Sequence, residues 1–200
     1  MGARESVVVV VVPQLDDPQE IARGLRERDP IVLDGLVERH KDRLIRYLLR
    51  LTSDRPAAED LFQETWLRVV DRGHQYDPAW TFLAWLLTIG RNLFIDSVRR
   101  SHPEKLGRFR GPDDDGQSLA PEDGSPSPFD QLAEREMRER VTEGFRRLPP
   151  LVQEVLTLRL DQGLSLREIA GVTGAPIPTV KARLYRGASA LARTAKGERP

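Results

Sequence analysis

A basic stretch near the C-terminus, residues 164–193, has the residue types and spacing of a DNA-binding unit. Ser165 and Glu168 form a capping box that begins a short helix, and Gly174 ends this helix where the chain must turn sharply. Residues 178–199 contain six Lys or Arg and one acid. Cations on an exposed helix contact phosphates and base edges, so the stretch predicts a helix-turn-helix whose second helix enters the major groove. The cations that project from this second helix are Lys181, Arg183 and Arg186.

The alternative for this stretch is an ordinary helical hairpin with a solvated basic face. The number of positions that fit the helix-turn-helix framework favours the DNA-binding unit.

A second stretch, residues 79–100, combines aromatic rings with cations and an amide. Aromatic rings stack on bases and guanidinium groups hold phosphates, so this composition suits single-stranded nucleic acid. Trp80 and Trp85 fit base stacking and core packing equally well, and the sequence leaves both possibilities open. One polar face of the predicted helix carries residues at helical spacing: Asn92, Asp96 and Arg99, with Arg91 and Arg100 beside them.

The preceding segment, residues 57–72, predicts a helix with one buried stripe and a second, mostly acidic face. The second face consists of Asp60, Gln63, Glu64 and Leu67, at positions i, i+3, i+4 and i+7. Charged faces are usually solvated surfaces, so the pattern alone indicates no partner.

Apolar residues recur at three- and four-residue steps along most of the chain, which predicts an all-α fold. Asp17-Pro18 and Asp29-Pro30 each place a capping residue before a proline suited to the first helical turn. The predicted helices cover 17–28, 30–51, 57–72, 79–100, 129–147, 150–162, 165–172 and a last helix that begins at Pro178 or Thr179. The predicted core stripe of the helix over 79–100 is Phe82, Leu86, Ile89 and Leu93. The Val7–Val12 tract stays undecided between a disordered lead-in, a stray strand and part of a misassigned start.

Charge and composition limit the remaining possibilities. The chain has 31 Lys or Arg and 31 Asp or Glu, and residues 111–130 carry six acids and no Lys or Arg, so the zero net charge is a cancellation between basic helical regions and an acidic segment. Residues 102–110 are still basic, whereas residues 111–128 are rich in Gly, Pro, Ser and Asp, and we predict a flexible linker over 101–128. No cysteine is present and the three histidines lack ligand spacing, so we expect no metal site and no cofactor. No apolar run approaches the roughly 20 residues of a membrane span, so we expect no membrane insertion and a cytoplasmic protein.

Two groups of motifs occur in a fixed order along the chain. The first comprises DLFQETWLR at 60–68, WL at 85–86 and RNLFIDSVRR at 91–100, and the second comprises LP at 148–149, LREIA at 166–170 and TVKARL at 179–184. Together they resemble the two conserved regions of an extracytoplasmic-function (ECF) RNA polymerase sigma factor, over residues 31–100 and 130–195. The resemblance implies two small helical domains: a sigma region 2 bundle over 17–100 and a sigma region 4 helix-turn-helix domain over 129–196. The flexible linker over 101–128 joins them, and residues 1–16 form an undetermined lead-in.

The resemblance also implies a function and its residues. Such a subunit is not an enzyme: it binds core RNA polymerase through the clamp helices and the flap, directs promoter recognition and transcription initiation, and is held by an anti-sigma factor. Core polymerase would be bound by Asp60, Gln63, Glu64 and Leu67. The −10 element of promoter DNA would be melted and held by Trp80, Trp85, Arg91, Asn92, Asp96, Arg99 and Arg100. The −35 element would be read by Thr179, Lys181, Arg183 and Arg186.

Four residues depart from the family pattern. Gly90 stands inside a predicted helix where the family usually has alanine; because glycine costs a helix interior about 0.5–1 kcal/mol, it indicates either a close helix contact or a softer point. Leu83 stands where a basic or polar residue is usual, and Ile177-Pro178 replaces the usual pair before the second helix of the helix-turn-helix.

Two other classes of protein compete with this interpretation. An ordinary DNA-binding regulator would share the helix-turn-helix but has no reason to carry the motifs at 60–68 and 91–100. An enzyme with an appended DNA-binding domain would need a nucleophile–base set, paired carboxylates or a phosphate-binding glycine loop, and the sequence shows none of these.

Overall fold

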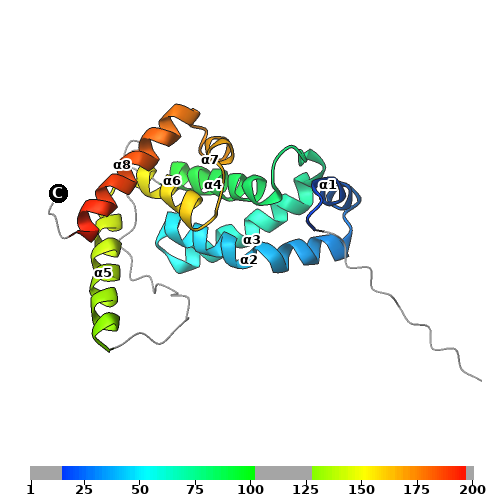
Figure 1. Cartoon of the computed structure of the whole chain (residues 1–200). Helices are drawn as coiled ribbons and strands as arrows, with labels where there is room; N and C mark the ends of the chain where they lie inside the picture. Colours follow the sequence, from blue (N-terminus) through cyan, green and yellow to red (C-terminus); the bar gives the residue numbers. More distant parts are fainter. Residues whose placement is uncertain (1–14, 102–127, 197–200) are drawn as a thin grey trace, which may run out of the picture.

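The computed structural model describes residues 15–101 and 128–196, which form helices and turns with no strand (Figure 1). The N-terminal bundle consists of α1 (Pro18–Glu27), α2 (Pro30–Thr52), α3 (Arg55–Arg72), the short 3₁₀ helix η1 (Gly73–Gln75) and α4 (Phe82–Ser101). The C-terminal bundle consists of α5 (Pro128–Arg146), α6 (Pro150–Leu160), α7 (Leu166–Thr173) and α8 (Ile177–Ala195). The all-α prediction is confirmed for these ranges. The Val7–Val12 tract and nearly all of the predicted linker lie outside the described residues.

Three helices of the N-terminal bundle begin with the same device. The side chains of Asp17, Asp29 and Asp54 each accept a hydrogen bond from a backbone N–H in the first turn of α1, α2 and α3, and each helix has a proline in its first two positions. The first two starts were predicted. The third helix begins at Arg55, two residues before its predicted start at Ala57, because Asp54 provides the cap.

Helix α4 begins later than its predicted start at Ala79. The backbone N–H of Trp80 donates to the carbonyl oxygen of Asp77 at 3.1 Å, and the Tyr76 hydroxyl donates to the Trp80 carbonyl oxygen at 2.7 Å. These bonds hold a turn before α4, so its first helical residue is Phe82. At the other end of the chain, α8 begins at Ile177, one residue before the earlier predicted start, with Pro178 in its first turn.

The predicted core stripe of α4 is half right. Phe82 and Leu86 are buried, whereas Ile89 and Leu93 are only partly buried. The buried arc is wider than one stripe because α4 packs against α2 and α3 on one side and α7 on another (Figure 1). It therefore also contains Leu83, Leu87 and Phe94.

Gly90 marks a close crossing of α4 with α2 and α3. A Cβ atom at this position would lie 3.3 Å from Leu48 Cδ2 and 3.4 Å from Thr65 Oγ1. These distances are shorter than or at the edge of ordinary contact, so a residue without a side chain lets the helices approach. Of the two explanations that the sequence left open, the close contact is confirmed.

One apolar core runs through both bundles. It joins buried side chains of α2, α3 and α4 to Val155 and Leu158 of α6, Ile169 and Val172 of α7, and Val180 of α8. A smaller cluster in the C-terminal bundle holds α6 against α5 and α8 and contains Leu148, Val152 and Leu156. The two bundles are thus packed side by side, with α7 against α4 and α6 against α2 (Figure 1).

Among the residues that the structure describes, no helix has both the length and the apolar character needed to cross a membrane. The same residues contain no group of three or more His, Asp or Glu side chains arranged to hold a metal ion.

Candidate nucleic-acid and protein interfaces

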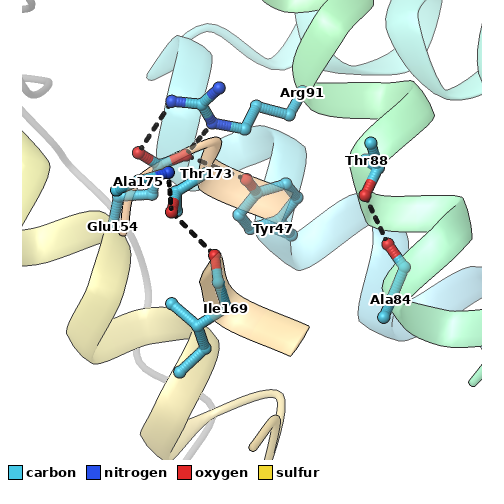
Figure 2. A network of polar contacts seen from close by, with 8 residues as sticks. All are labelled: Tyr47, Ala84, Thr88, Arg91, Glu154, Ile169, Thr173 and Ala175. Carbon is cyan, nitrogen blue, oxygen red and sulfur yellow. Dashed lines mark hydrogen bonds and ion pairs between the residues drawn. The ribbon is translucent and has the colours of Figure 1, made fainter. Parts of the chain in front are cut away.

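The helix-turn-helix is formed by α7 and α8. The Ser165 side chain accepts from the backbone N–H of Glu168, while the Glu168 carboxylate accepts from the backbone N–H of Ser165, which confirms the predicted capping box. Gly174 ends α7 with φ of 67°, in the left-handed region that glycine favours. The Thr173 hydroxyl donates to the Ile169 carbonyl oxygen at 2.7 Å and so completes the last turn of α7 (Figure 2).

Helix α8 has one buried face and one exposed basic face. Val180 is fully buried, and Gly187 lies so close to α6 that a Cβ atom there would approach Leu156 Cδ1 to 2.6 Å. Lys181 and Arg186 are exposed, while Thr179 and Arg183 are partly buried. The pattern indicated that all three cations among the predicted −35 residues project from the helix; Lys181 and Arg186 do so, whereas Arg183 is partly covered.

Tyr185 is an exposed aromatic residue of α8 that the sequence interpretation missed. Its side chain is 78% exposed, between the exposed cations of the same helix. A large ring left in solvent beside cations is unusual for a core aromatic, and it offers apolar and hydrogen-bonding contact to a partner. Its position one residue after Leu184 of the apolar stripe was the available signal.

The acidic face of α3 is open to solvent. Asp60 and Gln63 are exposed, Leu67 is 62% exposed, and Glu64 is partly buried. The Glu64 carboxylate accepts from Arg68 Nε at 2.8 Å on the same helix. An exposed leucine among carboxylates and an amide gives this face both apolar and polar contacts for a protein partner.

A groove connects this face of α3 to the C-terminal half of α4. Its walls carry Asp60 and Glu64 from one helix and three predicted −10 residues from the other, and Leu93 and Phe94 of α4 also line it. The three residues from α4 are Asp96, Arg99 and Arg100. The structure therefore brings part of the predicted polymerase set and part of the predicted −10 set into one groove. Asn92 is exposed on the same helix.

Trp85 lies in an aromatic cluster at the start of α4. Its ring centroid is 5.4 Å from that of Tyr76 and 5.8 Å from that of Phe82, and the residue is partly buried. This packing fixes the ring while leaving part of it accessible.

Trp80 contacts the C-terminal bundle. The Arg167 guanidinium carbon of α7 lies 5.2 Å from the centre of its ring, and a Cβ atom at Gly171 would lie 3.1 Å from the ring edge. Next to it, the Thr81 hydroxyl donates to the Glu168 carboxylate. Burial raises the pKa of this carboxyl, but the hydrogen bonds from Ser165 and Thr81 outweigh it and lower the pKa below its ordinary value.

Arg91 is not free on the α4 surface: it forms an ion pair with Glu154 of α6 (Figure 2). Arg91 Nε donates to Glu154 Oε1 at 2.6 Å, and the Tyr47 hydroxyl of α2 donates to the same oxygen at 3.1 Å. The side chains of Arg91 and Glu154 are 14% and 1% exposed. Burial lowers the pKa of Arg91, but the Glu154 hydrogen bond and charge outweigh it and raise the pKa. Burial, and then the Glu154 charge, raise the pKa of Tyr47 well above its ordinary range.

Glu154 and Arg167 were not among the predicted functional residues. Glu154 is an acid within an apolar helical segment, and this was the signal in the sequence: a buried charge requires a partner. Which cation serves as its partner depends on the packing of the two bundles.

The chain matches two family models, "Sigma-70 region 2" over residues 36–103 and "Sigma-70, region 4" over residues 138–191. It is 35% identical over 160 residues to the ECF RNA polymerase sigma factor SigE of Mycolicibacterium smegmatis, covering 79% of this chain and 59% of SigE. It is 33% identical over 172 residues to the ECF RNA polymerase sigma factor SigL of Mycobacterium tuberculosis, covering 84% of this chain and 91% of SigL.

The fold is similar to a solved structure as well. The sigma factor RpoE of Bartonella quintana, in complex with the anti-sigma factor NepR, matches with a TM-score of 0.57 and 23% identity, over 83% of this chain and 98% of that one. The chain thus spans less than two thirds of SigE and nearly the whole of SigL and RpoE.

Proposed function

This chain belongs to the ECF RNA polymerase sigma factors, and we propose that it binds core RNA polymerase and directs promoter recognition and transcription initiation. The observation that carries the proposal is the exposed α3 face that ends in Leu67. A regulator that only binds duplex DNA needs the basic face of α8 but has no use for an exposed leucine on the same helix face as Asp60 and Glu64. In this role the protein is a transcription initiation factor in the cytoplasm and not an enzyme.

The proposed polymerase contact uses Asp60, Gln63, Glu64 and Leu67, which dock on the clamp helices. Leu67 supplies apolar area to the contact, and the acids on the N-terminal side of the same face supply charge complementarity. The C-terminal bundle makes a second contact with the polymerase, at the flap.

The proposed promoter contacts lie on two helices. On α8, Thr179, Lys181, Arg183 and Arg186 contact the −35 element in the major groove, where cations bind phosphates and base edges. On and before α4, the aromatic rings and cations hold the melted −10 strand: Trp80, Trp85, Arg91, Asn92, Asp96, Arg99 and Arg100. Extracting a base from the stack costs a few kcal/mol, which stacking and phosphate contacts offset.

An anti-sigma factor is the further partner that we propose. RpoE of Bartonella quintana is bound by NepR, and this chain shares its fold. The open groove between α3 and α4 and the exposed α3 face are the surfaces that such a protein would cover to exclude polymerase.

The decisive experiment mixes the purified chain with core RNA polymerase and measures co-elution and promoter-dependent transcription. We expect both. Glu64→Lys reverses a charge on the α3 face and should abolish co-elution, whereas Glu38→Lys, which reverses an exposed acid on α2, should not. Tight binding to duplex DNA without any binding to core polymerase would instead identify an ordinary DNA-binding regulator.

A narrower experiment examines α8. Arg183→Ala should weaken binding to the −35 element by about 1–3 kcal/mol if the side chain reads a base, and by an amount independent of sequence if it only meets phosphate. Arg193→Ala, in the last turn of the same helix, is the matched control and should have little effect on sequence preference.

A further inference from the structure

Contacts between the two bundles cover part of the proposed −10 surface. Arg91 is paired with the buried Glu154 and Trp80 lies against Arg167 and Gly171. A strand of DNA cannot stack on a ring or pair with a guanidinium group that another helix already occupies. The bundles must therefore separate before these two residues can act as proposed.

The other recognition surfaces stay accessible in the same arrangement. Lys181 and Arg186 of α8 are exposed, and Leu67 is 62% exposed on α3. The arrangement in which the two bundles are packed together, called the closed arrangement from here on, therefore hides part of the −10 surface. It leaves the exposed face of α3 and the outer cations of α8 accessible.

The interface between the two bundles combines an apolar core with specific polar contacts. Ile169 and Val172 of α7 share one core with the N-terminal bundle. Around this core, the Tyr47–Glu154–Arg91 network is accompanied by Arg43 of α2, whose guanidinium donates to the Gln162 backbone and side-chain oxygens. An apolar contact alone would tolerate sliding, whereas hydrogen bonds to a buried carboxylate fix one arrangement.

Glu154 is the centre of this interface. Its carboxylate is 1% exposed and accepts hydrogen bonds from two helices of the other bundle. A buried ion pair contributes modest net stability, but removal of one charge leaves the other buried without compensation, which strongly disfavours the arrangement. Loss of the Glu154 charge therefore acts on the closed arrangement more than on either bundle.

We propose that Glu154, held by Arg91 and Tyr47, is an autoinhibitory latch that keeps the C-terminal bundle over the −10 surface of α4 until polymerase binding separates the bundles. The consequence for promoter binding rests on the proposed function. The latch itself is a statement about the conformation of the free chain and is tested independently of transcription.

The test measures the distance between the bundles in the full-length chain. Because the chain has no cysteine, Asp34→Cys on α2 and Ala188→Cys on α8 provide two exposed sites for spin labels. Pulsed electron paramagnetic resonance should give one narrow distance distribution for the otherwise unchanged chain. Glu154→Gln should broaden it toward longer distances, with at least about a tenfold rise in the open fraction.

A second variant and a control accompany this measurement. Gly171→Leu places a side chain against the Trp80 ring without changing any buried charge, and should also open the chain. Asp161→Asn removes the charge from an exposed ion pair with Arg50 that also joins the bundles, at 3.3 Å, and leaves Arg50 over the Phe145 ring. It should leave the distribution unchanged because exposed pairs contribute little. Circular dichroism verifies that each variant retains its helices.

The functional readout is binding of the free chain to two DNA probes of mixed sequence, one single-stranded and one duplex. Glu154→Gln should raise affinity for the single strand by about tenfold and leave duplex affinity unchanged, since Lys181 and Arg186 of α8 are already exposed when the bundles are packed together. A narrow distribution retained in folded Glu154→Gln and Gly171→Leu, or equal opening by Asp161→Asn, would overturn the latch. Failure of the chain to bind core polymerase would overturn the proposed function and leave the distance result intact.

Discussion

His40 on α2 predicts a specific dependence of stability on pH. Its side chain is 7% exposed, its Nδ1 has no hydrogen-bond partner among the described residues, and its ring centroid lies 5.3 Å from that of Phe82. Burial is the largest cause of the change in its pKa, followed by the charges of Arg43 and Arg39, and together they lower the pKa from 6.5 to about 4. The imidazole is therefore neutral in the folded chain at pH values where it is charged in the unfolded chain.

The sign and size follow from linkage between protonation and folding. Above pH 6.5 both states are neutral at His40, so the residue adds no pH dependence there. As the pH falls from 6.5 to about 4, the unfolded chain takes up the proton first, and the free energy of unfolding falls by about 1.4 kcal/mol per pH unit. The total loss is about 3 kcal/mol. Below pH 4 both states are protonated and the contribution of His40 ends.

Urea unfolding at a series of pH values between 7.5 and 4 measures this curve. His40→Leu replaces the ring with an apolar side chain of similar size and should remove about 3 kcal/mol of the fall in unfolding free energy. The contribution of carboxylates to the free energy of unfolding, including that of Glu168 with its lowered pKa, also falls with pH. These carboxylates are common to the original chain and to His40→Leu, so their contribution cancels in the difference between the two. His74→Gln changes an exposed histidine as the matched control. An equal fall in the original chain and in His40→Leu would refute the reasoning.

Three further variants test packing and capping by thermal and urea unfolding. Gly187→Val should destabilise by about 1–3 kcal/mol, because a Cβ atom there would lie 2.6 Å from Leu156 Cδ1 and 2.8 Å from Val152 Cγ1; unchanged stability would contradict the close crossing. Ser165→Ala removes the cap of α7 and should cost about 1 kcal/mol. Leu158→Ala empties a fully buried site and should cost about 2–5 kcal/mol, and a cost below 1 kcal/mol would count against that core.

Much of the fold was predictable because its causes are local. The capping box of Ser165 and Glu168, and the Asp-Pro starts of α1 and α2, depend on residues within one helical turn of each other. The boundaries that differed have local causes of another kind. Helix α4 begins after its predicted start because the Tyr76 hydroxyl donates to the carbonyl oxygen of Trp80 and holds a turn there. A single hydrogen bond of this kind produces no periodic pattern in the sequence, so it could not be predicted.

The candidate surfaces were predictable in part. Helical spacing placed Asp60, Gln63 and Leu67 on one exposed face and Lys181 and Arg186 on another. Spacing along α4 grouped its polar residues, but did not show that Asp96, Arg99 and Arg100 share a groove with α3, because this depends on the packing of the two helices. The functions assigned to these residues came from the family resemblance and remain proposals.

By itself, the sequence determined the helices, the helix-turn-helix and the family, since periodicity, caps and motifs are written in neighbouring residues. Only the tertiary structure decided the partners of residues far apart in the chain. Arg91 meets Glu154 across 63 positions, and Thr81 meets Glu168 across 87. The neighbouring residues in the sequence do not distinguish an exposed arginine that can bind DNA from one that pairs with a buried carboxylate. The choice depends on which helices the apolar core brings together, and that is a property of the whole chain.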